Sequence, residues 1–320
     1  MLKVPMLFPG QASQAVGMAR DLAARGGPGA AFLATVDEAL GFGLTGVMYE
    51  GPEATLTETW NAQPAILAHS VAVALELKAL GIEPSVVAGH SLGEFSAAVA
   101  VGALTPRDGL ALVRRRGELM FAAGQERPGT MAAVMGLDAD VVQRVCAEVA
   151  ASAGVVVVAN HNSSNQVAIS GETAAVDAAC EALKSAGAKR ALRLNVSGAV
   201  HSPLLAGAAA SFADHLAAVP VADPVAPLVA NVTAAPSTTA AQLRDGFRQQ
   251  LTSPVRWHES LAALVSGAAG GERPRVVLEV GPGKVLSNLA KREHPEVTFL
   301  AVGTSDELDN ALDTVRGLLA

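Results

Sequence analysis

The sequence is poor in cysteine, aromatic residues and long apolar runs, and each shortage excludes a class of protein. Its 320 residues include two cysteines, Cys146 and Cys180, and they do not form a C-x-x-C pair. This argues against a disulfide-stapled secreted fold. No apolar run approaches the roughly 20 residues that cross a bilayer. We therefore expect a reduced, cytoplasmic protein that does not associate with membranes.

Basic residues and metal-binding patterns are also scarce. The chain has 23 Lys and Arg against 30 Asp and Glu, a net charge of −7, whereas nucleic-acid binding needs a basic surface. It contains neither an H-x-x-x-H motif nor a Cys/His cluster, so we expect no metal site. Gly281-x-Gly283 lacks the third glycine of a dinucleotide-binding turn and follows the last strand that we predict. We expect no cofactor.

What the chain does contain is alternating apolar strands and alanine-rich helices. Hydrophobic residues make up 50% of the chain although aromatic residues are only 3%, and alanine favours helix. We predict strands at 3–8, up to Ala88, at 228–232 and at 275–280, with helices between them. This order predicts a doubly wound parallel sheet that binds ligands at the carboxyl ends of its strands.

The middle of the chain has a different order. Between residues 130 and 196 the pattern is β-α-β-β-α-β, the order of a ferredoxin-like subdomain. The last strand is predicted over 189–196. The Gln-Glu-Arg-Pro-Gly stretch at 125–129 is a suitable boundary. We therefore predict a large α/β subdomain over 1–126 and 197–320, with a ferredoxin-like subdomain over 127–196.

Gly89-His90-Ser91-Leu92-Gly93 follows a β-branched run and precedes an alanine-rich run. Gly-x-Ser-x-Gly between a strand and a helix is the context of a nucleophile elbow. A chance match is conceivable in a chain with 31 glycines, but the flanking strand and helix disfavour it. The motif predicts acyl transfer through an ester on Ser91.

A nucleophilic serine needs a base, and His201 is the best of seven histidines. It ends a loop and directly precedes the Ser202-Pro203 helix start, whose positive end disfavours an imidazolium. His90 leaves the elbow in another direction, and His69 lies inside the helix that we predict over 63–80. No acid follows Ser91 in a suitable context, which indicates a Ser–His dyad oriented by a carbonyl or amide.

Arg116 lies on the apolar side of the helix that begins at Pro106. It falls on the same helical stripe as Leu112, Val113, Leu119 and Met120. A buried arginine needs an anion. The partner is either an internal carboxylate such as Glu118 or Glu94, or the carboxylate of a substrate. The residues alone leave the two readings open.

Together these features resemble the malonyl-CoA:acyl carrier protein transacylases. The resemblance covers essentially the whole chain and rests on segments in their expected order. They are Phe8 to Gln14, Asn61 to Ala65, Gly89 to Glu94, Arg116-Gly117, Val196 to Ser202, Gln250 to Trp257 and Glu279 to Lys284.

The resemblance implies a hydrolase-like α/β body that carries the ferredoxin-like subdomain. It implies a ping-pong reaction in which Ser91 attacks malonyl-CoA with His201 as base. The amides of Gln11 and Leu92 would form the oxyanion hole, and Arg116 would grip the malonyl carboxylate. The main-chain carbonyl of Gln250 would orient the histidine.

Further expectations concern the pocket and the partners. Gln63 would line the pocket. The partners would be malonyl-CoA and an acyl carrier protein, with CoA thioester and phosphopantetheine as substrates, and we expect a monomer. Carrier proteins are usually acidic, so docking needs basic residues near the cleft. The candidates are Lys189, Arg190, Lys284, Lys291 and Arg292, and ordinary surface charge explains them equally well.

Substrate choice has one open point. Leu92 fits malonyl-type members, but Val200 stands where Phe or Ser is common and would border the acyl α-carbon. A trans-acting polyketide acyltransferase with methylmalonyl or broad specificity is therefore an alternative. A serine thioesterase or esterase is another, and a carrier-binding relative without activity is a third.

Overall fold

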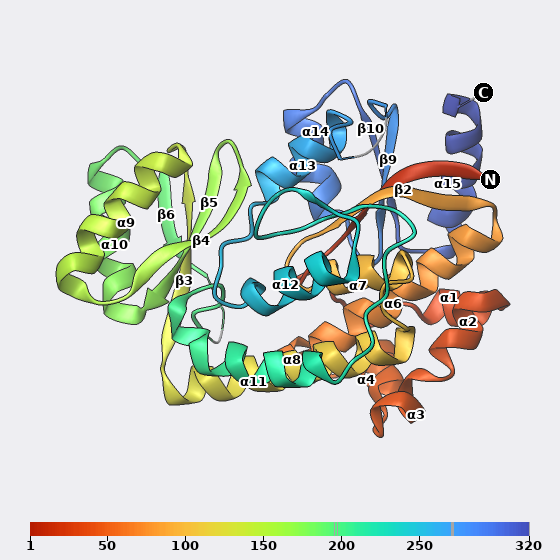
Figure 1. Ribbon diagram of the computed structural model, residues 1–320, viewed down its shortest axis with the longest axis horizontal. Helices are drawn as coiled ribbons and strands as arrows, with labels where there is room; N and C mark the ends of the chain where they lie inside the picture. The colour runs from red at the N-terminus through yellow and green to blue at the C-terminus, as the bar shows by residue number, and fades with distance from the viewer. Residues whose placement is uncertain (195, 197, 270–271, 320) are drawn as a thin grey trace.

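The computed structural model describes residues 1–194, 196, 198–269 and 272–319, which form two adjoining α/β units (Figure 1). The larger unit contains a six-stranded sheet in the order β10-β9-β1-β2-β7-β8, parallel except for β7 against β8. Its strands are β1 (Leu2–Phe8), β2 (Ile82–Gly89), β7 (Leu228–Val229), β8 (Pro236–Ser237), β9 (Val276–Val280) and β10 (Thr298–Val302).

Strand β1 lies inside this sheet and is buried on both faces. Val4, Met6 and Phe8 enter the main apolar cluster, whereas Leu7 enters the cluster on the opposite face. This alternation is the period of two that a strand imposes. Helices therefore have to cover both faces, as in other parallel sheets.

The large unit carries thirteen helices in the described residues, of which α6 and α8 are the longest. They are α1 (Arg20–Arg25), α2 (Gly27–Leu33), α3 (Val36–Leu40), α4 (Leu44–Glu50), α5 (Glu53–Thr57), α6 (Thr59–Ala79), α7 (Gly93–Ala100), α8 (Pro106–Glu126), α11 (Ala206–Ala217), α12 (Ala240–Gln250), α13 (Trp257–Val265), α14 (Val285–Glu293) and α15 (Ser305–Leu319), with a 3₁₀ turn at Pro203–Leu205. Among all the residues that the structure describes, no helix is both long and apolar enough to cross a membrane.

Helix α6 starts at Thr59, four residues before the predicted start. Pro64 lies within it and cannot donate to the carbonyl of Trp60. Nη1 of Arg114 donates to that carbonyl instead, at 3.2 Å. The contact comes from the neighbouring helix α8, so helix packing stabilises a turn that the local sequence disfavours.

The smaller unit is an antiparallel sheet backed by two helices. Its elements are β3 (Gly129–Met135), α9 (Ala139–Ala153), β4 (Val156–Ser163), β5 (Gln166–Glu172), α10 (Thr173–Ser185) and β6 (Arg190–Arg193). The strand order β4-β5-β3-β6 is that of a ferredoxin-like fold, so the predicted fold class is confirmed. The boundaries at 126/127 and 196/197 stay predictions.

The last strand of this unit is shorter than predicted. β6 ends at Arg193 rather than 196. Asn195, placed in that strand, and Ser197, the first residue after the predicted boundary, lie outside the described residues, as do 270, 271 and 320.

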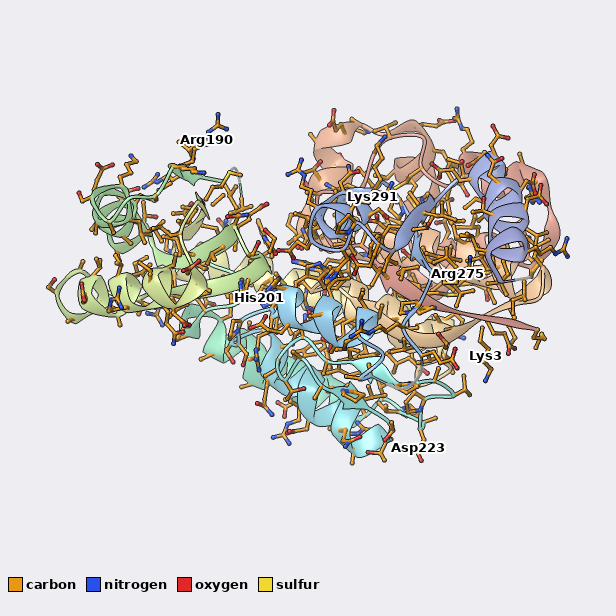
Figure 2. All side chains as sticks on the ribbon, turned by 90° about the horizontal axis from the view of Figure 1, so that it is seen from above. Lys3, Arg190, His201, Asp223, Arg275 and Lys291 are labelled. Carbon is orange, nitrogen blue, oxygen red and sulfur yellow. The ribbon has the colours of Figure 1, made fainter. Side chains whose placement is uncertain are left out.

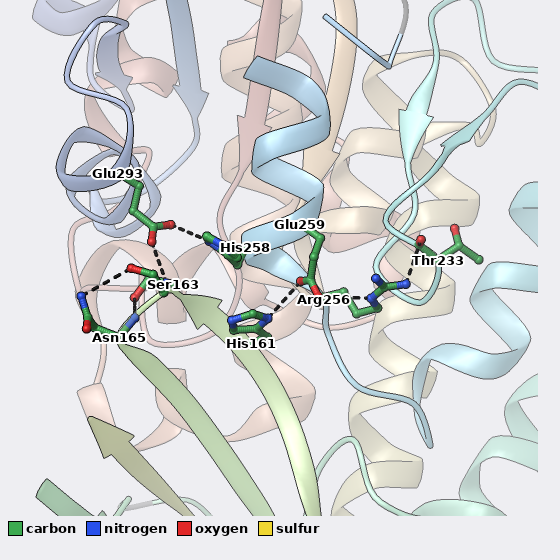
Figure 3. Close-up of polar contacts among 9 residues, drawn as sticks. His161, Ser163, Asn165, Thr233, Arg256, His258, Glu259 and Glu293 are labelled. Carbon is green, nitrogen blue, oxygen red and sulfur yellow. Dashed lines mark hydrogen bonds and ion pairs between the residues drawn. The ribbon is translucent and has the colours of Figure 1, made fainter. Parts of the chain in front are cut away.

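A backbone seam joins the two units beside the sheet. The amide of Val255 donates to the carbonyl of Ala159 at 2.8 Å, and the amide of His161 donates to Val255 at 2.9 Å. Next to this pair, Nδ1 of His161 lies 3.2 Å from a carboxylate oxygen of Glu259 on α13 (Figure 3). The small unit is thus attached through β4.

Glu293 at the end of α14 extends the seam (Figure 3). One carboxylate oxygen lies 2.8 Å from Nδ1 of His258, and the other accepts the amide of Ser164 at 2.6 Å. Ser164 follows β4, so this carboxylate ties the hairpin of the small unit to two helices of the large one.

In two regions the sequence predicts little, namely only a helix from near Gly17 in the first, where α1 begins at Arg20. Residues 20–57 form five short helices, and the chain ends with β10 and α15. Helices of five to seven residues are too short to show a clear period of 3.6 in the sequence.

Candidate active site

Ser91 stands on a sharp turn between β2 and α7. Its φ is +51°, in the left-handed region that a non-glycine residue rarely adopts. A side chain on Gly89 would overlap the backbone of Gly93, and one on Gly93 would overlap the carbonyl of Phe8. Both glycines of the motif are therefore required for the close approach of backbone segments that lifts Ser91 out of the sheet.

The structure brings His201 against Ser91. Nε2 of His201 lies 2.7 Å from Oγ of Ser91, and Nδ1 lies 2.9 Å from the carbonyl oxygen of Gln250. A carbonyl only accepts, so Nδ1 carries the proton and Nε2 accepts from the serine hydroxyl. Gln250 therefore fixes the tautomer that a general base needs.

His201 is only 3% exposed. Burial, together with the charge of Arg116, lowers the pKa of His201 to about 3. The ring is neutral at physiological pH, as a general base must be. The sequence analysis predicts a neutral ring from the following helix start, whereas burial is the largest cause in the structure.

Arg116 is completely buried on α8 and reaches the serine. Its Nη2 donates to Oγ of Ser91 at 3.1 Å and to Oε1 of Gln250 at 2.9 Å. Its Nη1 donates to Oε1 of Gln63 at 2.8 Å. All three acceptors are neutral, so the guanidinium charge has no hydrogen-bonded counter-ion among the described residues.

The two internal carboxylates considered for Arg116 do not pair with it. Glu118 pairs with Arg114 at 2.8 Å and with Arg115 at 3.3 Å. Glu94 forms no ion pair with Arg116 within the described ranges, although its charge acts on the guanidinium. Burial lowers the pKa of Arg116 to about 10, which leaves it protonated near neutrality. Such a cation favours the binding of an anionic group.

Of the predicted oxyanion-hole residues, Leu92 directly follows the serine and Gln11 contacts Gln63. The amide of Ser91 itself is occupied, since it donates to Oδ1 of Asn231 at 2.8 Å. The amides of Leu92 and Gln11 donate to no other group in the part of the chain that the structure describes. Both are thus free for a ligand. Oε1 of Gln11 lies 3.3 Å from Nε2 of Gln63, which links it to the arginine site.

Val200 and His201 lie where the two units meet, and Figure 2 labels His201 there. Val200 is half-buried and packs against Met131, Ala159 and Ala168 of the small unit. The small unit therefore contributes a wall beside the predicted pocket.

The other buried histidines have partners of their own. Nε2 of His90 lies 2.9 Å from Oδ1 of Asn162, and its ring packs against Trp257. Nε2 of His69 lies 2.6 Å from the carbonyl of Gly303. Within the described residues, neither imidazole ring has a hydrogen bond to Ser91.

Sequence reasoning missed Asn231 and the role of the Glu94 carboxylate. Nδ2 of Asn231 donates to the carbonyl of Gly89 at 2.6 Å, so this side chain spans both ends of the elbow. Glu94 accepts from the backbone amide of Asn231 at 2.9 Å and from Nε2 of Gln250. Asn231 carries no local motif. A charged residue on the buried helix after Ser91 was the available signal for Glu94.

A serine on an elbow, a neutral histidine and a buried cation at one sheet edge define an enzyme built for acyl transfer. The comparisons agree with this class. The acyl transferase domain family matches residues 6–302. Two relatives are both named malonyl CoA-acyl carrier protein transacylase. The one from Bacillus subtilis is 39% identical over 99% of this chain and 98% of its own. The one from Escherichia coli K12 is 40% identical over 98% of this chain and 100% of its own.

Solved structures agree as well. A malonyl-transacylase in complex with its type II PKS acyl-carrier protein matches with a TM-score of 0.91 and 39% identity, over 98% of this chain and 99% of that one. The malonyl CoA-acyl carrier protein transacylase of Coxiella burnetii matches with a TM-score of 0.91 and 33% identity, over 98% of both chains. The chain belongs to the acyl transferase family, among its malonyl CoA-acyl carrier protein transacylases.

Proposed function

We propose that this chain transfers a malonyl group from malonyl-CoA to the phosphopantetheine thiol of an acyl carrier protein. The intermediate is an ester on Ser91, and no cofactor is needed besides these substrates. The observation that carries the proposal is the buried guanidinium of Arg116, whose Nη2 lies 3.1 Å from Oγ of Ser91 and which donates to no carboxylate among the described residues. The names of the relatives support the same substrates.

In the first half-reaction, Oγ of Ser91 attacks the thioester carbonyl carbon and Nε2 of His201 takes the hydroxyl proton. The amides of Leu92 and Gln11 stabilise the oxyanion, and one such donor is worth about a hundred- to a thousand-fold in rate. When the C–S bond breaks, the CoA sulfur leaves with the proton from His201. The product is malonyl-Ser91.

In the second half-reaction, the carrier thiol gives its proton to His201 and attacks the ester carbonyl. The C–O bond to Ser91 breaks, and the serine oxygen recovers the proton. The base must be neutral at the start of each half, which fits a histidine whose pKa burial lowers to about 3.

Arg116 selects a malonyl group because its guanidinium lies at the distance from Ser91 that the free carboxylate would reach. In a malonyl ester one CH₂ separates the reacting carbonyl from the free carboxylate, so that carboxylate lies close to the guanidinium beside Ser91. Oε1 of Gln63 and Oε1 of Gln250 hold the guanidinium in place. An acetyl group lacks the carboxylate, and water carries no group for Arg116 to bind.

The side chains of Val200 and Leu92 would exclude the α-methyl group of a methylmalonyl substrate. Val200 is half-buried between the two units, and the side chain of Leu92 is fully buried. We propose a preference for malonyl over methylmalonyl of about tenfold or more, since one methyl group in a fitted pocket changes kcat/KM by about 10- to 200-fold.

Intact-protein mass spectrometry after mixing with malonyl-, methylmalonyl- or acetyl-CoA tests the proposal. We expect a malonyl adduct that is absent in Ser91→Ala and that moves to a carrier-protein thiol. Rapid loss of the adduct to water without transfer would indicate a thioesterase. A methylmalonyl adduct formed with the higher kcat/KM would overturn the selectivity, and no adduct at all would overturn the proposed activity.

A further inference from the structure

Gln250 contacts four polar residues of the site, through both its backbone carbonyl and its side-chain amide. Its backbone carbonyl faces Nδ1 of His201, and its side-chain Oε1 accepts from Arg116 at 2.9 Å. Its side-chain Nε2 donates to the backbone carbonyl of Ser91 at 3.0 Å and also to Glu94. The side chain is 1% exposed, so water does not compete for these contacts.

The amide of Gln250 works in only one of its two orientations. A half-turn about its last bond exchanges the oxygen and nitrogen. The NH₂ group would then face the guanidinium of Arg116, donor against donor, and the oxygen would face Glu94. An ionised carboxylate only accepts hydrogen bonds, so Glu94 excludes the turned orientation.

The other carboxylate oxygen of Glu94 stabilises the turn that carries Ser91, through Asn231. It accepts from the backbone amide of Asn231 at 2.9 Å. The side chain of that residue receives the amide of Ser91 at 2.8 Å and donates to the carbonyl of Gly89 at 2.6 Å. The left-handed backbone of Ser91 is therefore fixed by two residues that both depend on Glu94.

We propose that Glu94 is a positioning residue for acyl transfer, whose ionised carboxylate orients Gln250 and Asn231 and through them the Ser91–His201 pair and Arg116. Glu94 has no hydrogen bond to Oγ of Ser91 or to the ring of His201 within the described residues, so its effect is transmitted. The kinetic part of the test rests on the proposed function, and the labelling part does not.

Because the proposed role requires an ionised Glu94, the rate of the reaction should depend on pH. Burial raises the pKa of Glu94 to about 7, against the opposing effect of its hydrogen bonds and of Arg116. Protonation turns one oxygen into a donor that meets either Nε2 of Gln250 or the amide of Asn231. Around this carboxyl, Arg116 on α8 stays charged, and burial lowers the pKa of His201 and of His90, which keeps both rings neutral.

The experiment compares Glu94→Gln with Glu279→Gln. Glu279 is a matched control because it too is fully buried and accepts two backbone amides, from Leu286 at 3.0 Å and from Ser287 at 2.7 Å. Among the described residues its carboxylate has no hydrogen bond to any residue of the site. For each folded variant, two rates are measured between pH 5 and 9: labelling of Ser91 by a fluorophosphonate, and formation of the malonyl-enzyme.

In the unchanged chain both rates rise with pH through a midpoint near 7, the pKa of Glu94. Glu94→Gln lowers both about 10- to 100-fold at pH 8 and removes this rise, because its NH₂ cannot accept. Glu279→Gln keeps both the rate and the rise. The effect falls on kcat more than on KM.

A folded Glu94→Gln with an unchanged rate and pH profile overturns the proposal. If this variant does not fold, Glu94→Asp decides. It keeps the charge but is too short to reach both donors, so we expect slower labelling that still rises with pH. Labelling as fast as in the unchanged chain overturns the proposal. Ser91 labelling with this pH profile but without any malonyl adduct would refute the proposed substrate and leave the role of Glu94 intact.

Discussion

At the scale of single residues, we propose that Arg116 decides which acyl group the site accepts. Its guanidinium is buried, and its three hydrogen-bond acceptors are all neutral. A buried charge left without a partner costs roughly 3–5 kcal/mol. A substrate carboxylate would lower that cost, so we propose that this cation, which has no hydrogen-bonded carboxylate among the described residues, is the physical basis of selectivity.

Replacing Arg116 by alanine tests this. We expect kcat/KM for malonyl-CoA to fall about 100- to 1000-fold, from the loss of a buried charge pair. Acetyl-CoA should be affected much less. Arg115→Ala is the control, because Arg115 is the next residue along the chain and its side chain pairs with Glu118 at the surface. Equal losses for both thioesters would contradict the selective role.

At the scale of elements, the strand–turn–helix unit around Ser91 depends on close contact between backbones. Gly89 and Gly93 approach each other, and Gly93 also meets the carbonyl of Phe8 on β1. The elbow is therefore built into the centre of the sheet, and its strain is held by the neighbouring strand.

Gly93→Ala should lower the free energy of unfolding by at least about 3 kcal/mol, since backbone atoms have to move apart. The measurement is urea unfolding followed by circular dichroism. Gly207→Ala on α11 is the control, because nothing lies within 4 Å of its added carbon. It should be stabilising by about 0.5–1 kcal/mol. Similar values for the two variants would contradict this account of the elbow.

The seam between the units supports another prediction at this scale. Burial tends to raise the pKa of Glu293, but its hydrogen bonds from Ser164 and His258 outweigh burial and lower it. A carboxyl with a lowered pKa stabilises the fold above its unfolded pKa of about 4.5. That contribution is lost as the pH falls through the folded pKa.

Glu293→Gln should therefore cost about 1–2 kcal/mol of unfolding free energy at pH 7. The difference should shrink as the pH falls below about 4.5. Chemical unfolding at pH 7 and pH 4 measures it. Glu296→Gln, at a side chain that is 65% exposed, should change stability by less than about 0.5 kcal/mol. A difference that does not depend on pH would exclude the ionised Glu293 as its cause.

At the scale of the whole molecule, the chain has a net charge of −7, which has to be reconciled with the acidic carrier protein that the resemblance leads us to expect. Local basic residues on exposed positions would do so. In Figure 2, Arg190 lies on the small unit and Lys291 on the large one, with His201 between them. We propose that Lys189, Arg190 and the basic residues of α14 attract the carrier.

Reversing the charges with Lys189→Glu and Arg190→Glu should lower kcat/KM for the carrier about tenfold at low salt. The effect should fade at high salt. Malonyl-enzyme formation from CoA should stay within about twofold. Reversal at Lys3 and Arg275, which Figure 2 shows on the large unit, on the far side of Lys291 from Arg190, is the control. An unchanged carrier rate would remove these two residues from the docking surface.

The sequence by itself determined the fold class and the central residues of the candidate site. The elbow is a contiguous motif, and its glycines are visible because the turn requires them locally. Arg116 is visible because a helical period places it on an apolar stripe. The strand at 3–8 and the β-α-β-β-α-β order likewise follow from local patterning.

Only the tertiary structure decided what surrounds those residues. Asn231 lies 140 residues from Ser91, and the hydrogen bonds of Gln250 and Glu94 cross between α12 and α7. It also showed that burial and Arg116 keep His201 neutral. Desolvation and contacts between distant segments exist only once the chain is packed, and a linear pattern carries no record of them.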